Sequence, residues 1–132
     1  PADRTLWATA LREAFEEVGL DNSHLQFLGL LDPHVTLGSH SIIHPFVAVL
    51  PERPDLTPNP DEVEAIRHVP LEDLLEDDAW REERWETSLG PVTVTFFELA
   101  DDTVWGATAA MLRQLLVLSL GVTDEGYVHN NG

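Results

Sequence analysis

Helical spacing of apolar residues dominates the start of the chain. Over residues 4–18 apolar side chains recur every three or four positions, the spacing of a buried helical stripe, and include Leu11, Phe15 and Val18. Asp3 is the expected N-cap of this helix. Gly19 stands where a glycine commonly ends a helix. The pattern therefore predicts a helix that begins close to the first residue.

Extended spacings follow, and they predict strands. The candidate strands are residues 24–31, 40–50, 62–69 and 92–99. Pro45 within the second run indicates an edge or a bulge, because proline cannot donate to a sheet ladder. Pro70 predicts the start of a short helix over residues 70–75. An apolar helix is predicted over residues 105–120, and residues 121–132 are expected to form a tail.

Length and composition are those of one globular domain. The chain has 132 residues, 43% of them hydrophobic, which is enough for a core. It has no cysteine, which excludes disulfides and thiolate metal sites. No stretch approaches the roughly 20 apolar residues that span a membrane, and no basic segment precedes an apolar one as in a signal peptide. We expect a cytoplasmic protein unless a targeting segment precedes residue 1.

The charge balance is strongly acidic. Seven basic and 24 acidic side chains give a formal charge of -17. Such a surface repels phosphate backbones, so we expect no nucleic acid partner. A small phosphorylated substrate could still bind if metal ions offset the local field.

Three carboxylates of the first helix share one face. Glu13, Glu16 and Glu17 lie within roughly one third of the helix circumference, at about 100° per residue. Like charges at this spacing destabilise an isolated helix. Carboxylate oxygens suit magnesium, which also keeps water and phosphate ligands. The pattern therefore indicates either a divalent metal site or an ordinary solvated face.

The run Arg12 to Leu20, REAFEEVGL, resembles a family motif. It matches the second half of the Nudix box, G-x5-E-x7-R-E-U-x-E-E-x-G-U with U apolar. The seven specified positions are filled by Arg12, Glu13, Ala14, Glu16, Glu17, Gly19 and Leu20. The chain thus resembles Nudix hydrolases.

The first half of the motif departs from this pattern. Its glutamate position is occupied by Arg4, while Asp3 could supply a carboxylate one residue earlier, and its glycine would precede Pro1. The chain therefore begins inside the box, and we expect upstream residues in the native protein.

Further segments resemble the coenzyme A pyrophosphatase-like subgroup of Nudix proteins. These are Pro1–Asp3 with Thr9–Glu13, Ile43–Val49, Asn59–Val63 followed by Val69–Leu71, and Trp105–Ala109. The resemblance implies an α/β fold, the Nudix α/β/α sandwich with a mixed sheet whose N-terminal strands are missing from this chain. It implies a Nudix domain over residues 1–121 and a tail over 122–132.

The resemblance also implies roles for individual residues. Glu16 and Glu17 would be the leading ligands of Mg²⁺ or Mn²⁺, and Glu13 would be a third ligand or would orient the site. Arg12 would pair with Glu16, one turn away. Glu62 is the candidate general base, with Glu64 behind it.

The function implied is hydrolysis of a nucleoside diphosphate linked to another group. Coenzyme A or its thioesters would give 3',5'-ADP and a phosphopantetheine moiety. ADP-ribose or NADH is an alternative substrate, and Arg4 favours a binding domain without turnover. A purely structural acidic domain is a third, weaker reading. A homodimer is a further expectation.

Histidines and tryptophans are the other residue classes with candidate roles. His34, His40 and His44 could contribute to a zinc site with carboxylates, although surface or cleft positions are the simpler reading. Trp80, Trp85 and Trp105 could stack on an adenine, although packing is the default for each.

Overall fold

A computed structural model describes residues 5–36, 39–63, 65–123 and 126–127. The chain forms two compact units. The first comprises Pro1–Val35 and Ser41–His68, and the second comprises Thr36–His40 and Val69–Gly132.

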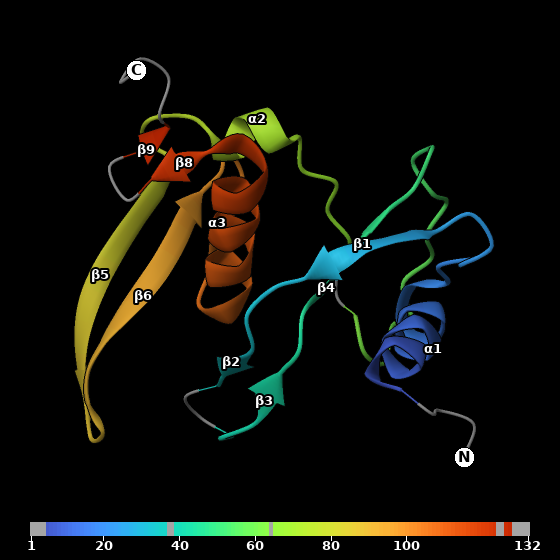
Figure 1. The fold of residues 1–132 in the computed structure, drawn as a ribbon, viewed down its shortest axis with the longest axis horizontal. Coiled ribbons are helices and arrows are strands. Elements are labelled where there is room, and N and C mark those ends of the chain that lie inside the picture. Colours follow the sequence, from blue (N-terminus) through green and yellow to red (C-terminus); the bar gives the residue numbers. More distant parts are fainter. Residues whose placement is uncertain (1–4, 37–38, 64, 124–125, 128–132) are drawn as a thin grey trace. The chain divides into compact units, whose positions relative to one another are not determined.

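The described residues form helices and antiparallel sheets (Figure 1). The helices are α1 (Leu6–Val18), α2 (Leu71–Leu74) and α3 (Ala107–Leu120). The strands are β1 (Gln26–Leu30), β2 (His34–Val35), β3 (Ile42–Ile43), β4 (Phe46–Val49), β5 (Trp80–Thr87), β6 (Gly90–Glu98), β7 (Thr103–Trp105), β8 (Val122–Thr123) and β9 (Gly126–Tyr127). They pair as β1-β4, β2-β3, β5-β6-β7 and β8-β9. The α/β class predicted from the sequence is confirmed.

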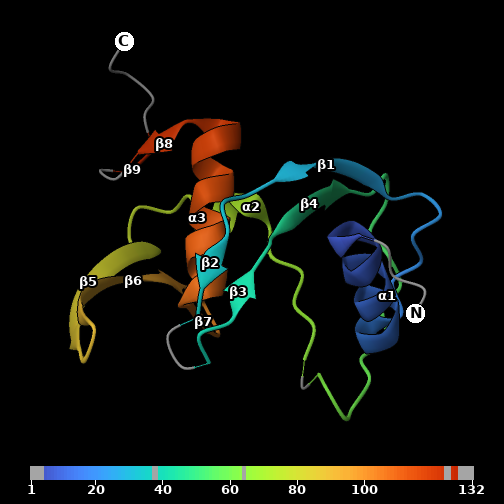
Figure 2. The same ribbon diagram turned by 60° about the horizontal axis from the view of Figure 1, so that its bottom comes forward.

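In the first unit, α1 lies beside the β1-β4 ribbon (Figure 2). Aromatic rings join the two elements. The ring centroid of Trp7 lies 5.1 Å from that of Phe27 and 5.4 Å from that of Phe46. The register of β1 shifts between Phe27 and Gly29, so the ribbon contains an irregularity there. The contact fixes the N-terminal half of α1 against the ribbon.

The start of α1 differs from the prediction. Asp3 lies outside the described residues, and the N-cap is Thr5, whose Oγ1 accepts a hydrogen bond from the Ala8 N–H at 3.0 Å. This bond satisfies one of the four amides that a helix leaves without a partner at its start. The predicted end is confirmed, because Gly19 is the C-cap with φ 70°.

The predicted buried stripe of α1 is only partly formed. Leu11 and Val18 are half-buried, but Phe15 is 64% exposed. No residue of α1 is fully buried. Helical spacing identifies the apolar face correctly, but burial requires a packed neighbour, and the prediction for Phe15 is wrong.

In the second unit, α3 packs on one face of the β5-β6-β7 sheet (Figure 1). Phe97 of β6 and Leu116 of α3 are fully buried at the centre of this core. Ala109 of α3 lies beside them, and Leu74 and Ala79 complete the buried cluster. The Arg113 guanidinium lies 3.6 Å from the centre of the Trp80 ring, a cation–π contact at the margin of the core.

Several strand predictions need correction. Residues 62–69 form no strand within the described part of the chain, since 59–63 are held in a turn. The run 40–50 forms β3 and β4 with a break at Pro45, which supplies no ladder donor. β5 was not predicted, because its sequence is charged. Within the expected tail, β8 pairs with β9.

None of the described helices is both long enough and apolar enough to cross a bilayer.

Candidate functional site

The exposed face of α1 carries the three predicted metal ligands. Glu13 and Glu16 are exposed, and Glu17, nearest the end of the helix, is half-buried. Their spacing along a regular helix places them on one side, opposite Leu11 and Phe15. The backbone therefore presents an acidic surface, as the sequence predicts.

Arg12 contacts this surface. One of its terminal nitrogens donates a hydrogen bond to Glu16 Oε1 at 3.0 Å, one helical turn away. The pairing expected between Arg12 and a carboxylate of the motif is thus present. It fixes the direction of Glu16 relative to the helix.

The glutamate side chains do not converge. Among the described residues, no group of three or more histidine or acidic side chains lies close enough to hold a metal ion. The chemistry of the donors suits a hard cation, because all three offer carboxylate oxygens from one helix face. As they stand, these side chains fit partial ligation completed by water or substrate, rather than a closed protein cage.

The last turn of α1 is fastened to a distant segment. Thr57 N–H donates to the Val18 carbonyl at 2.9 Å, and Asn59 N–H donates to the Glu17 carbonyl at 2.7 Å. A helix leaves its last four carbonyls without partners of its own, and two of them are satisfied here. Gly19 turns the chain away with positive φ, and a Cβ built there would lie 3.9 Å from Thr57 backbone atoms.

This segment continues into a turn that carries Glu62. The Asn59 carbonyl accepts from the amides of Glu62 and Val63 at 3.0 and 2.8 Å. Glu62 is exposed, and Glu64 lies outside the described residues. The structure therefore connects the Glu62 backbone to the Glu17 end of α1 through a single residue, Asn59.

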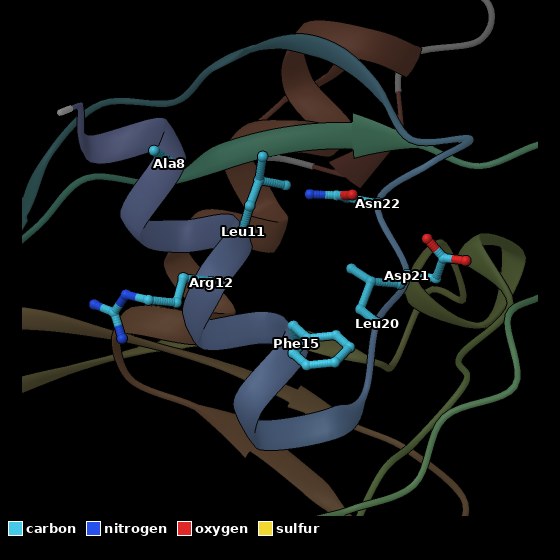
Figure 3. Close-up of a pocket in the computed structure, with 7 residues that line it drawn as sticks. All are labelled: Ala8, Leu11, Arg12, Phe15, Leu20, Asp21 and Asn22. Carbon is cyan, nitrogen blue, oxygen red and sulfur yellow. The ribbon is translucent and has the colours of Figure 1, made fainter. Parts of the chain in front are cut away.

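A groove of about 460 Å³ lies on the other side of the helix (Figure 3). Leu11 and Phe15 line it from α1 and Leu20 lines it from the chain that follows the helix, with Arg12 at its margin. None of the three glutamates of the motif lines it. The groove and the acidic face are therefore distinct surfaces of α1.

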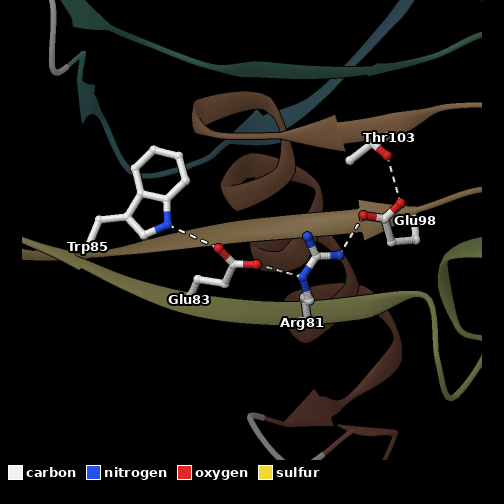
Figure 4. Close-up of polar contacts among 5 residues, drawn as sticks. All are labelled: Arg81, Glu83, Trp85, Glu98 and Thr103. Atoms are coloured by element: carbon white, nitrogen blue, oxygen red, sulfur yellow. Dashed lines mark hydrogen bonds and ion pairs between the residues drawn. The ribbon is translucent and has the colours of Figure 1, made fainter.

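The second unit holds a polar network on the face of its sheet turned away from Phe97 (Figure 4). Arg81 donates to Glu98 and to Glu83, and Thr103 donates to Glu98. The hydrogen bond from Arg81, followed by that from Thr103, lowers the pKa of Glu98. These partners keep Glu98 ionised and tied to the sheet, as in a structural ion pair.

The tryptophans pack on their neighbours. The Trp85 ring lies 5.8 Å from Trp105 and 6.1 Å from Phe96, and Trp105 stacks on Phe96 at 16°. Packing, the default expected for each tryptophan, accounts for these contacts.

The histidines join no metal-binding cluster within the ranges that the structure describes. The alternative of a zinc site built on His34, His40 and His44 therefore finds no support there.

The role of Asn59 was missed by sequence reasoning. Its segment was noted, but not its bond to α1. The available signal was Asn59-Pro60-Asp61, a composition typical of turns in which a side chain caps a nearby amide.

Comparison with known proteins identifies the family that this chain resembles. A model described as NUDIX domain matches residues 1–89. The Nudix hydrolase NudL of Photorhabdus laumondii subsp. laumondii, which is named as uncharacterized, is 35% identical over 115 residues, or 87% of this chain and 61% of the relative. Nudix hydrolase 22, chloroplastic, of Arabidopsis thaliana is 37% identical over 110 residues, or 79% of this chain and 36% of that protein.

A third relative is Nudix hydrolase 15, mitochondrial, of Arabidopsis thaliana. It is 34% identical over 110 residues, which are 79% of this chain and 38% of that protein. The chain thus spans between about a third and three fifths of the length of these relatives.

Proposed function

This chain belongs to the NUDIX domain family, and from that premise we propose that it hydrolyses a nucleoside diphosphate joined to another group. The observation that carries the proposal is the acidic face of α1, where Glu16 is held by Arg12 at 3.0 Å beside Glu13 and Glu17. The family match over residues 1–89 includes this helix and the Glu62 turn.

The charges of the face explain why a cation is needed. A diphosphate approaching three carboxylates on a chain of formal charge -17 meets repulsion. Glu13, Glu16 and Glu17 are the residues that would hold Mg²⁺ or Mn²⁺. When bound, the cation would neutralise phosphate oxygens and make water more acidic. Since magnesium often takes only one or two protein carboxylates with water and phosphate, three converging groups are not required.

The roles of the protein's own groups follow. Glu62 accepts a proton from the attacking water as the water oxygen bonds to phosphorus. The bond between phosphorus and the bridging oxygen breaks, and that oxygen leaves with the electron pair on the second phosphate. Arg12 keeps Glu16 directed along the face. A carboxylate can perform this proton transfer if it lies within hydrogen-bond reach of the water.

The proposed substrate is coenzyme A or an acyl-coenzyme A, giving 3',5'-ADP and the corresponding phosphopantetheine. Support comes from segments that resemble those of the coenzyme A-directed subgroup, namely Ile43–Val49, Asn59–Val63 followed by Val69–Leu71, and Trp105–Ala109. ADP-ribose and NADH are alternatives, because the glutamate face addresses only the diphosphate.

Product analysis tests the proposal. The chain is incubated with coenzyme A, acetyl-coenzyme A, ADP-ribose or NADH in Mg²⁺ or Mn²⁺, and products are separated by ion-exchange chromatography. We expect 3',5'-ADP from the first two, loss of product with chelator, and loss with Glu17→Gln. Glu52→Gln, an exposed change in the same unit, is the matched control. Intact coenzyme A after prolonged incubation would reject this substrate.

Two observations favour a second candidate, a domain that binds without turnover. No described trio of acidic or histidine side chains converges on a point, and Arg4 replaces the glutamate of the motif's first half. Titration calorimetry with Mn²⁺, for wild type and Glu17→Gln, separates the two. A binding-only domain should give the same Mn²⁺ titration for wild type and Glu17→Gln, and no product from coenzyme A under either metal.

Homodimerisation is a separate part of the proposal. Light scattering coupled to size-exclusion chromatography measures the mass directly, and a value of about one chain, 14.7 kDa, would reject the dimer.

A further inference from the structure

Asn59 uses three hydrogen-bonding groups at the junction between α1 and the Glu62 turn. Its N–H donates to the Glu17 carbonyl at 2.7 Å. Its carbonyl accepts from the amides of Glu62 and Val63 at 3.0 and 2.8 Å. Its side-chain Oδ1 accepts from the Asp61 N–H at 3.1 Å. One residue therefore faces the helix with its amide and the turn with its oxygens.

We propose that Asn59 is a positioning residue that holds the Glu62 turn against the glutamate-bearing end of α1. The inference rests on the proposed function, in which Glu62 serves the same phosphorus as Glu16 and Glu17. A proton acceptor misplaced by about 1 Å can cost about 100-fold in rate. The position of the Glu62 turn should therefore affect the rate of hydrolysis as well as the stability of the fold.

The neighbouring residue explains why this position needs a side-chain oxygen. Pro60 has no N–H, so the Asp61 N–H is the first amide of the turn that must find an acceptor. Asn59 Oδ1 supplies it, closing a turn of the kind that asparagine and aspartate form with the amide two residues on. Aspartate keeps this acceptor and alanine removes it.

Thr57 forms the second attachment, but a different one. Its N–H donates to the Val18 carbonyl at 2.9 Å, so this bond holds the loop to the helix and does not involve the Asn59 side chain. Loss of the Asn59 side chain should therefore loosen the turn while the Thr57 attachment keeps the loop near the helix. The expected defect is one of orientation.

The test compares Asn59→Ala, Asn59→Asp and Asp21→Ala. Asp21 is the matched control, because its Oδ1 also accepts from the amide two residues on, Ser23 at 2.9 Å, outside the Glu62 turn. We expect Asn59→Ala to lower kcat by about 10- to 100-fold with little change in KM, as for residues that orient a reacting group. Asn59→Asp should restore most of kcat, and Asp21→Ala should leave it unchanged.

A double variant separates positioning from a general structural role. If Asn59 acts through Glu62, then Asn59→Ala should have little further effect in a Glu62→Gln background. An equal loss of kcat in both backgrounds would overturn the inference.

Hydrogen exchange provides a readout independent of turnover. Asn59→Ala should speed exchange of the Glu62 and Val63 amides, and leave that of Ser23 unchanged. Unaltered exchange at Glu62 and Val63 would overturn the inference, whatever the activity. If wild type hydrolyses nothing but exchange is faster in Asn59→Ala, the proposed function is rejected, whereas the role of Asn59 in holding the Glu62 turn stands.

Discussion

Arg12 and Glu16 lie one helical turn apart on α1, with a guanidinium nitrogen 3.0 Å from a carboxylate oxygen. Their side chains are 44% and 55% exposed. An exposed pair at this spacing contributes only about 0.3–0.5 kcal/mol to stability. The pair therefore matters more for the orientation of the Glu16 side chain than for the stability of the helix.

Arg12→Gln should accordingly separate stability from function. We expect the free energy of unfolding to fall by less than about 0.5 kcal/mol, and Mn²⁺ affinity or hydrolysis to fall by about 10- to 100-fold. Urea unfolding and Mn²⁺ calorimetry measure the two effects. A variant with unchanged metal affinity and activity would show that the pair is an ordinary surface contact.

Gly19→Ala should destabilise the first unit through the backbone. Gly19 has φ 70°, a left-handed conformation that costs an L-residue about 1–2 kcal/mol. The nearest atoms to an added Cβ are 3.9 Å away, so steric overlap is not the cause. Urea unfolding should show a smaller loss for Gly19→Asn, because asparagine tolerates this region better. Equal losses for alanine and asparagine would contradict the explanation.

Phe97 and Phe15 should respond differently to truncation. Phe97 is fully buried and Phe15 is 64% exposed. Removal of a buried phenylalanine side chain typically costs about 3–5 kcal/mol, and we expect Phe97→Ala to approach that cost. Phe97→Leu keeps much of the volume and provides a variant that still folds. Phe15→Ala should cost far less, and comparable shifts in Tm would contradict the burial described for the two rings.

Glu98 should make stability depend on acidic pH. Its hydrogen bonds from Arg81 and Thr103 lower its pKa in the folded protein below the usual 4.5. The stabilisation is therefore present above the unfolded-state pKa and is lost as pH falls through the lower folded-state value. The difference in Tm between wild type and Glu98→Gln should shrink as pH falls below about 4.5. Glu82→Gln, outside the network, is the control, and a difference that stays constant with pH would contradict the assignment.

The two ends of α1 show what local sequence can and cannot determine. Gly19 could be identified because left-handed backbone favours glycine irrespective of distant contacts. At the other end Asp3 and Thr5 are both good N-cap residues, and only the bond from Ala8 to Thr5 distinguishes the one used. The exposure of Phe15 could not be predicted either, since spacing defines an apolar face of the helix but not which element packs against it.

Strands that depend on pairing with distant segments were the harder part of the fold to predict from the sequence. β5 has a charged sequence, and its conformation follows from pairings such as Arg81 opposite Phe96 and Glu83 opposite Val94. These contacts come from another strand, so no local pattern in β5 reveals them. Residues 62–69 are the opposite case. Their alternating pattern predicts a strand, but the described residues form none, and the run begins in a turn anchored by Asn59.

For the candidate site, residue types and spacing placed three glutamates and Arg12 on one helix face. The Arg12–Glu16 pair is confirmed. The metal ligands and Glu62 as base stay predictions. The attachment of Asn59 to Glu17 could not be foreseen, because it joins segments distant along the chain.

The charged sequence of β5 has a consequence for the protein in concentrated solution. Within the described sheet β5 is an outer strand, and Glu82, Arg84 and Glu86 on it are exposed. Such charges discourage a second molecule from adding its own strand to an open backbone edge. Replacement of all three by threonine should therefore promote aggregation, seen as rising static light scattering, whereas the native strand should keep the molecules apart.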